Sequence, residues 1–160
     1  MLTGRPPHLQ HFDYTGIHRY SLTFCTNRRR PLFAEASIVE LVLSQISRAS
    51  QEHGFAVIAY CFMPDHAHLL VHGQCEAADC KRFITAAKQY SGYYYRRRFP
   101  GMLWQRYGYE RTLRNGEDTV TVARYILENP VRAGLTQTVE QYPFVGSLVC
   151  ELRELLLSID

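Results

Sequence analysis

Two neighbouring apolar segments, residues 55–63 and 66–73, constrain the fold of this chain most strongly. The first is almost continuously apolar, as expected for a strand buried on both faces. Only Pro64 and Asp65 separate it from the second. Because strands joined by so short a turn must run antiparallel, the sequence predicts an antiparallel hairpin at the centre of a sheet.

The second segment of this hairpin alternates in character. Successive side chains of a strand point to opposite faces. Three imidazoles therefore share one face: His66, His68 and His72. Three apolar residues share the other: Ala67, Leu69 and Val71. We predict one face made largely of imidazole and one face that belongs to the core.

Periodicity predicts the other elements. Alternating apolar residues indicate a strand at residues 19–26, and residues 102–113 fit a short hairpin or an extended loop. Helical spacing indicates four helices, at residues 37–53, 77–99, 119–129 and 148–159.

Local signals predict where some of these helices begin and end. Ser37 and Glu40 have the spacing of a capping box, and Gly54 is suited to close the same helix. Pro130 is expected to end the third helix at Asn129, because the residue before a proline is pushed out of the helical region.

These elements predict an α+β fold in which helices pack on one face of an antiparallel sheet. A chain of 160 residues is long enough for one domain with a substantial core. We expect an irregular arm over residues 1–16, one domain over residues 17–147 and a C-terminal helix over residues 148–160.

The imidazole face is a candidate metal site. His66 and His68 can hold one cation from one side if a third ligand is supplied from elsewhere, whereas His72 lies about 13 Å from His68, too far for the same ion. Tyr125 and Asn129 are four residues apart on a predicted helix and therefore share a face. A helix that offers the Asn129 amide oxygen to a metal also presents the Tyr125 hydroxyl beside it.

Three motifs, in this order, carry a resemblance to a known family. They are Pro64-Asp65-His66-Ala67-His68-Leu69-Leu70-Val71, then Trp104-Gln105 with Tyr109-Glu110-Arg111, and then Ala123-Arg124-Tyr125-Ile126-Leu127-Glu128-Asn129-Pro130-Val131-Arg132-Ala133-Gly134-Leu135. Together they resemble the single-tyrosine HUH transposases, and most of all those associated with repetitive extragenic palindromes (REP). The likeness runs from about residue 19 to residue 147.

The resemblance implies a ferredoxin-like or RRM-like HUH fold and a metal-dependent strand transferase that cuts single-stranded DNA through a 5′-phosphotyrosine. It implies Tyr125 as the nucleophile and His66, His68 and Asn129 as metal ligands. By itself, this uncharged ligand set suits Mn²⁺ or Zn²⁺ at least as well as Mg²⁺. The resemblance favours Mg²⁺ or Mn²⁺. The expected partner is single-stranded or hairpin DNA, and both a monomer and a homodimer remain open.

Basic residues are clustered more than the formal charge of +3 suggests. Two runs of three arginines, at residues 28–30 and 96–98, could form positive surfaces for phosphates, or could equally be solvated ends of elements. We expect DNA contacts from ten residues: Arg28, Arg29, Arg30, Lys88, Arg96, Arg97, Trp104, Gln105, Arg111 and Arg132. A lone tryptophan such as Trp104 is more often a core anchor. Asp65 and Glu128 adjoin the candidate site, where either could be a general base or a hydrogen-bond partner of a histidine, but we prefer to interpret them as ordinary turn and helix-surface acids.

The five cysteines are odd in number and form no C-x-x-C pair, so neither a disulfide framework nor a zinc ribbon is indicated. The sequence has no secretory signal and no apolar run near the ~20 residues that span a bilayer. We therefore expect a cytoplasmic protein with reduced thiols and no membrane partner.

Two other classes of function remain. A non-catalytic module that binds single-stranded nucleic-acid hairpins would use a similar sheet, but the histidine strand has no aromatic ladder for stacking bases. A zinc deaminase would need an H-x-E motif before its cysteines, and none precedes Cys75 and Cys80. The binding module remains the alternative to a strand transferase.

Overall fold

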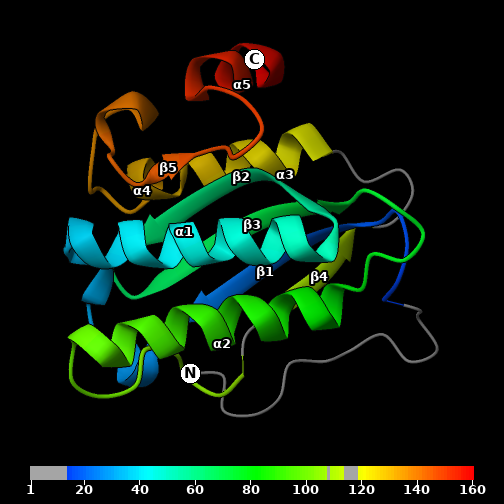
Figure 1. Cartoon of the computed structure of the whole chain (residues 1–160). Coiled ribbons are helices and arrows are strands. Elements are labelled where there is room, and N and C mark those ends of the chain that lie inside the picture. Colours follow the sequence, from blue (N-terminus) through cyan, green and yellow to red (C-terminus); the bar gives the residue numbers. More distant parts are fainter. Residues whose placement is uncertain (1–13, 108, 114–118) are drawn as a thin grey trace.

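A computed structural model describes residues 14–107, 109–113 and 119–160, and for residues 109–112 it describes the backbone alone. Most of the predicted N-terminal arm and the side chain of Arg111 therefore lie outside the described part. The centre of the fold is an antiparallel sheet in the order β4-β1-β3-β2-β5 (Figure 1). Its strands are β1 Arg19–Cys25, β2 Phe55–Met63, β3 His66–Gly73, β4 Tyr109–Leu113 and β5 Val145–Gly146.

The histidine strand β3 lies in the middle of the sheet, as the hairpin predicts. It pairs with β2 on one side and with β1 on the other. In this register His68 is opposite Thr23 of β1 and Cys61 of β2. The neighbours of the histidine are thus fixed by backbone pairing on both sides.

Two long helices cover the face of the sheet that carries Leu69 and Val71. They are α1, Ala36–His53, and α2, Cys80–Arg98, and they lie side by side in front of the strands (Figure 1). Gly54 closes α1 in the left-handed region with φ of 71°, as predicted. The predicted capping box is wrong, because the helix begins at Ala36 after Glu35, which makes no capping hydrogen bond through its side chain.

The opposite face, which carries the histidines, is covered as well. Helices α3, Thr119–Leu127, and α5, Leu152–Ile159, form a second apolar cluster with the sheet. The prediction of an α+β antiparallel sheet is confirmed, but helices lie on both faces and not on one. Alternate side chains of β2 enter the two clusters, which explains its almost unbroken hydrophobicity, and the irregularity between Val57 and Ala59 shifts which positions face each cluster.

The helix of Tyr125 ends earlier than predicted. It stops at Leu127, and a new short helix, α4, runs over Asn129–Arg132. Pro130 stands at the start of α4, where a proline has no hydrogen bond to lose, and it is buried. The proline therefore lies in the first turn of a new short helix and does not end the helical segment.

The remaining elements tie the C-terminal part to the sheet. Short 3₁₀ turns occupy Asn27–Arg29, Leu32–Ala34 and Val139–Gln141. Strand β5, which sequence patterning missed, pairs with β2, and the Tyr142 hydroxyl donates to the Phe62 carbonyl. Leu155 and Ile159 of α5 are buried in the second cluster, so the last helix packs on the domain. Within the described residues no helix has the length and apolar character to cross a membrane.

The second cluster predicts a clear difference between neighbouring residues of α3. Ile126 is 1% exposed within it, whereas Tyr125 is 60% exposed. Ile126→Ala should lower the free energy of unfolding by about 2–4 kcal/mol, because it leaves a cavity beneath the helix. Tyr125→Phe should change it by less than about 0.5 kcal/mol. Urea denaturation of both variants measures this, and equal stabilities would contradict the packing of α3 on the histidine face.

Candidate active site

Two imidazoles of β3 face one another on the surface covered by α3. The Nε2 atoms of His66 and His68 are 3.1 Å apart, and their rings are nearly perpendicular at 86°. Both side chains project from the same face of the strand, as the alternation predicts. The pair directs two ring nitrogens toward a common point.

Each ring is oriented through its other nitrogen. The Oδ1 atom of Asp65 lies 2.7 Å from Nδ1 of His66, and Oγ1 of Thr23 lies 2.9 Å from Nδ1 of His68. An ionised carboxylate only accepts hydrogen bonds, so His66 carries its proton on Nδ1 and presents a lone pair at Nε2. Hydrogen bonds of this kind commonly hold metal-binding histidines in position.

The distance between the two Nε2 atoms fits a shared cation. Nitrogens about 2.1 Å from one ion lie about 3.0 Å apart at right angles and about 3.4 Å apart in a tetrahedral arrangement. The observed 3.1 Å falls between these values. In the absence of a cation the contact is favourable only if His68 carries a proton on Nε2, because two lone pairs facing each other repel. The distance between the two Nε2 atoms therefore fits two ligands of one metal ion.

Burial keeps His68 neutral. Burial, followed by the charge that His66 carries when it is protonated and by the positive charges of Arg132 and Arg29, lowers the pKa of His68 to about 4. A neutral imidazole is the form that binds a metal. His72 is on the same face but farther along β3, and burial and Arg19 also lower its pKa.

Arg29 holds Asp65, which in turn contacts His66. Its Nε donates to Oδ2 of Asp65 at 2.9 Å, and its Nη1 lies 3.1 Å from Sγ of Cys25. Burial alone would raise the pKa of Asp65, but the hydrogen bonds from Arg29 and His66 outweigh it, so the pKa of this carboxyl falls below its usual range. Asp65 is thus a partner of His66, and its interpretation as an ordinary turn acid is wrong.

The backbone around Arg29 is unusual. Arg28 and Arg29 both have left-handed conformations, with φ of 56° and 54°. Such conformations cost free energy for residues other than glycine and persist only where the surroundings enforce them. Here the turn directs the guanidinium of Arg29 back to Asp65, while Arg28 remains exposed.

Tyr125 lies on the exposed side of α3, whose buried side faces β2 and β3. The guanidinium carbon of Arg132 is 3.9 Å from the centre of the Tyr125 ring, and Arg132 also donates to the Tyr125 carbonyl. Arg132 is electrostatically coupled to His68 and Cys61, and it partly offsets the burial that raises the pKa of Cys61 to about 12. Arg132, at the α3–α4 junction, is therefore close enough to His68 to influence its charge.

Asn129 stands at this junction, partly buried, as the first residue of α4. Among the described residues, no group of three or more His, Cys, Asp or Glu side chains is arranged to hold an ion. Within the described part of the chain, a third protein ligand to the histidine pair would therefore be of another type, such as an amide oxygen. The role of Asn129 as that ligand stays a prediction.

Comparison with known proteins decides the family. The model of the family described as "Transposase IS200 like" matches residues 15–129, which include the histidine strand, Tyr125 and Asn129. The chain belongs to the IS200-like transposases.

Individual relatives agree with this assignment. The transposase is 24% identical over 144 residues to a Haemophilus influenzae protein named as a REP-associated tyrosine transposase, covering 82% of this chain and 81% of that protein. Its fold resembles the structure of a REP-associated tyrosine transposase bound to a REP hairpin, with a TM-score of 0.72, 20% identity, and 87% and 81% of the two chains covered. A transposase-like protein from Deinococcus radiodurans gives a TM-score of 0.52, with 20% identity and coverage of 81% and 97%.

The residues of the transposase that are expected to contact DNA lie in different environments. Trp104 is 7% exposed, packs against Phe24 and Phe33, and donates its indole N–H to Ser91, which favours the core-anchor alternative. Arg30 donates to the Met102 carbonyl and so joins two loops. Arg29 is engaged with Asp65, as described above.

Other basic residues of the transposase remain at the surface. Arg28, Arg96, Arg97 and Arg132 are exposed, and Lys88 and Gln105 are partly buried. Of the three consecutive tyrosines of α2, Tyr95 is buried, whereas Tyr93 and Tyr94 are exposed with their rings in an edge contact at 5.1 Å.

Sequence patterning missed Thr23 and the orienting role of Arg29. Thr23 had a detectable signal, because the predicted strand at residues 19–26 alternates. An antiparallel pairing with β3 that keeps both apolar faces on one side of the sheet brings its polar positions opposite the histidines. The exact register was not readable. The role of Arg29 had no such signal, since it depends on the left-handed turn.

The low pKa of His68 predicts how the metal-free transposase responds to pH. The folded imidazole takes up its proton near pH 4, whereas an unfolded histidine does so near pH 6.5. The stabilisation is therefore complete above pH 6.5 and is lost as the pH falls toward 4, by roughly 3 kcal/mol in all. Urea denaturation in the presence of a chelator should show a steeper loss of stability over this interval for the natural protein than for His68→Gln. Parallel pH profiles would contradict the burial of a neutral His68.

Proposed function

We propose that this transposase is a metal-dependent endonuclease and strand transferase that acts on single-stranded hairpin DNA, with Tyr125 as its nucleophile. The observation that carries the proposal is the convergence of the His66 and His68 Nε2 atoms, each ring held by its own partner, on the face covered by the helix of Tyr125. Family membership supports a transposase.

Tyr125 is the residue best suited to attack DNA. Its side chain is exposed on α3, while its helix is anchored by Ala123, Ile126 and Leu127 beneath it. In the proposed reaction the tyrosine oxygen bonds to the scissile phosphorus and loses its proton, and the bond from phosphorus to the 3′ oxygen breaks. This leaves a free 3′-OH and a 5′-phosphotyrosine. The reverse attack by a 3′-OH rejoins the strand and needs no nucleotide cofactor.

His66 and His68 would hold Mg²⁺ or Mn²⁺, with Asn129 as the proposed third ligand. The bound ion would polarise the scissile phosphate and stabilise the charge that develops on its oxygens. Asp65 and Thr23 would keep the two rings in the orientation that binding requires. Arg132, partly exposed beside the Tyr125 ring, is placed to attract the phosphate toward the nucleophile.

A hairpin with an unpaired flank is the proposed substrate. A solved relative of similar fold is bound to a REP hairpin. The exposed arginines of the turn after β1 and of the last turn of α2 supply positive charge for phosphates, independently of sequence. Chemistry on one strand requires that the strand be out of the duplex.

Tyr125→Phe is the sharpest test of the mechanism. The ring still packs under Arg132, so the fold and DNA binding should be unchanged, but strand cleavage and the covalent protein–DNA adduct should both fall below detection. A denaturing gel after incubation with a flanked hairpin and Mn²⁺ shows the adduct as a slow band. The exposed Tyr93→Phe and Tyr94→Phe variants serve as controls that retain the band. An adduct formed by Tyr125→Phe, or none formed by the natural protein, would refute the assignment.

A second test concerns the proposed ligands. His66→Ala and His68→Ala should each weaken Mn²⁺ binding at least about tenfold, and Asn129→Ala should weaken it as well. His72→Ala is the matched control, because His72 shares the face but is too distant to join the site. Calorimetric titration measures the affinities, and circular dichroism shows that each variant is folded. If Asn129→Ala binds Mn²⁺ as the natural protein does, Asn129 is not a ligand.

A further inference from the structure

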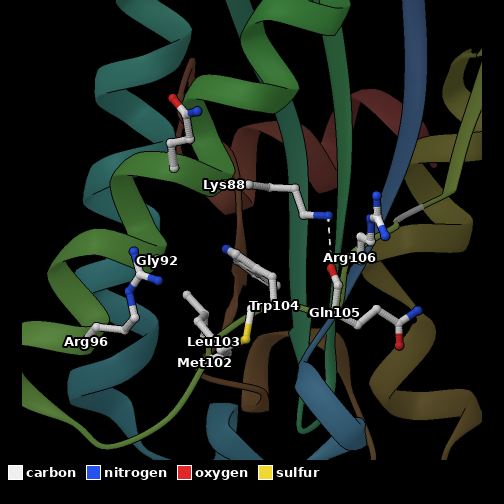
Figure 2. Close-up of a pocket in the computed structure, with 9 residues that line it drawn as sticks. Lys88, Gly92, Arg96, Met102, Leu103, Trp104, Gln105 and Arg106 are labelled. Carbon is white, nitrogen blue, oxygen red and sulfur yellow. Dashed lines mark hydrogen bonds between the residues drawn. The ribbon is translucent and has the colours of Figure 1, made fainter.

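A basic pocket lies beside α2, on the side of the sheet opposite the histidines. It has a volume of about 240 Å³ and is lined by α2 and by the segment that follows it, residues 102–106 (Figure 2). We call it the Trp104 pocket, after the indole in its wall. Pockets for drug-sized ligands usually exceed about 300 Å³, so this one suits a smaller group.

Three cations and no acid line the Trp104 pocket. Lys88 and Arg96 come from α2, and Arg106 comes from the following segment. The Lys88 side chain reaches across the pocket, and its Nζ makes a long hydrogen bond of 3.3 Å to the Gln105 carbonyl (Figure 2). None of the nine lining residues is Asp or Glu. A partly buried ammonium in such surroundings is stabilised by an anion from outside the chain.

Part of the remaining wall is apolar. Leu103 and Trp104 form its floor, and Met102, 56% exposed, stands at its rim. The indole N–H of Trp104 is held by Ser91, so the ring is fixed in place. An apolar wall beside positive charge matches a nucleotide, which combines a planar base with a phosphate.

Gly92 makes room for such a group. It lies within α2, where glycine costs about 1 kcal/mol relative to alanine, so its presence is not explained by helix formation. It lines the pocket, and a Cβ at this position would meet no protein atom within 4 Å. A side chain here would therefore project into open space in the pocket and not into the core.

The Trp104 pocket is connected to the active site through the edge of the sheet. Trp104 pairs with Thr26 and the Gln105 N–H donates to the Cys25 carbonyl, and Cys25 pairs in turn with His66. Tyr109 of the edge strand β4 pairs with Thr23, so this segment borders β1 at Thr23 and again at Thr26.

We infer that the Trp104 pocket binds one unpaired nucleotide of the DNA flank, with its base against the apolar wall and its phosphate near Lys88, Arg96 and Arg106. The strand leaves the histidine pair, crosses the end of β1 and enters the pocket. Burial lowers the pKa of Lys88, and a bound phosphate would raise it again. This inference rests on the proposed function, because it takes single-stranded DNA as the substrate.

The test uses Gly92→Leu, which fills the pocket without disturbing the core. Leucine is a better helix former than glycine, so the thermal midpoint should stay the same or rise. Thr85→Leu is the matched control, since Thr85 is exposed on the same helix two turns earlier and does not line this pocket. Binding is measured by fluorescence anisotropy with a labelled DNA hairpin that carries an unpaired 5′ flank of mixed sequence, and with the same hairpin without a flank.

Gly92→Leu should weaken binding of the flanked hairpin about tenfold and leave binding of the flankless hairpin unchanged. Removing the base at one flank position should weaken binding by the natural protein to a similar extent, and should have no further effect on Gly92→Leu. Thr85→Leu should bind both DNAs as the natural protein does. In a flank that carries 5-iododeoxyuridine, photo-crosslinks should map to the peptide containing Met102 and Trp104.

The outcomes separate this inference from the proposed function. If the natural protein forms the Tyr125 adduct and Gly92→Leu binds the flanked hairpin equally well, the pocket inference is overturned and the function stands. If binding depends on the flank and on Gly92 but no adduct forms at Tyr125, the pocket stands and the catalytic proposal fails. An equal loss for both hairpins would also overturn the inference, since it would indicate a general effect on the fold.

Discussion

The position of the two imidazoles depends on the pairing of three strands. Thr23 of β1 and Asp65 of the β2–β3 turn each hold one ring, and both are fixed by the register that places β3 between β1 and β2. A slip of one residue would turn every side chain of β3 to the opposite face, putting His66 and His68 into the main core. The two apolar clusters oppose such a slip, because β3 contributes Ala67, Leu69 and Val71 to one and Leu70 to the other. Burial of hydrocarbon on both faces therefore sets the geometry of the polar site.

The hairpin and the histidine face were predictable because both follow from alternation within a few residues. The second core was less accessible to prediction, although the unbroken hydrophobicity of β2 contained its signal. A strand can place apolar residues on both faces only if both are covered, and the helices that do so are distant in sequence. The break at Glu128 was also missed, since Pro130 is compatible both with the end of one helix and with the first turn of the next.

The residues of the candidate site also fall into two groups, those that the sequence predicts and those that only the fold reveals. His66, His68, Tyr125 and Asn129 were predicted from motifs, whereas the residues that orient the two histidines required the fold. Asp65 was visible but undervalued, because a turn acid is usually just solvated. Arg29 is expected to contact DNA, and two left-handed residues, a conformation that arginine does not signal in sequence, also hold it against Asp65. A cluster of arginines therefore predicts positive charge but not which of its members also make contacts within the protein.

The three arginines after β1 also show how one turn can serve two faces of the sheet. Arg29 points to the histidine face through Asp65, while Arg30 reaches the Met102 carbonyl at the rim of the Trp104 pocket. Glycine at position 101 helps, because its positive φ of 85° shapes the loop and its lack of a side chain leaves room for the Arg30 guanidinium. The turn thus joins the loop that lines the pocket to the residue that orients His66.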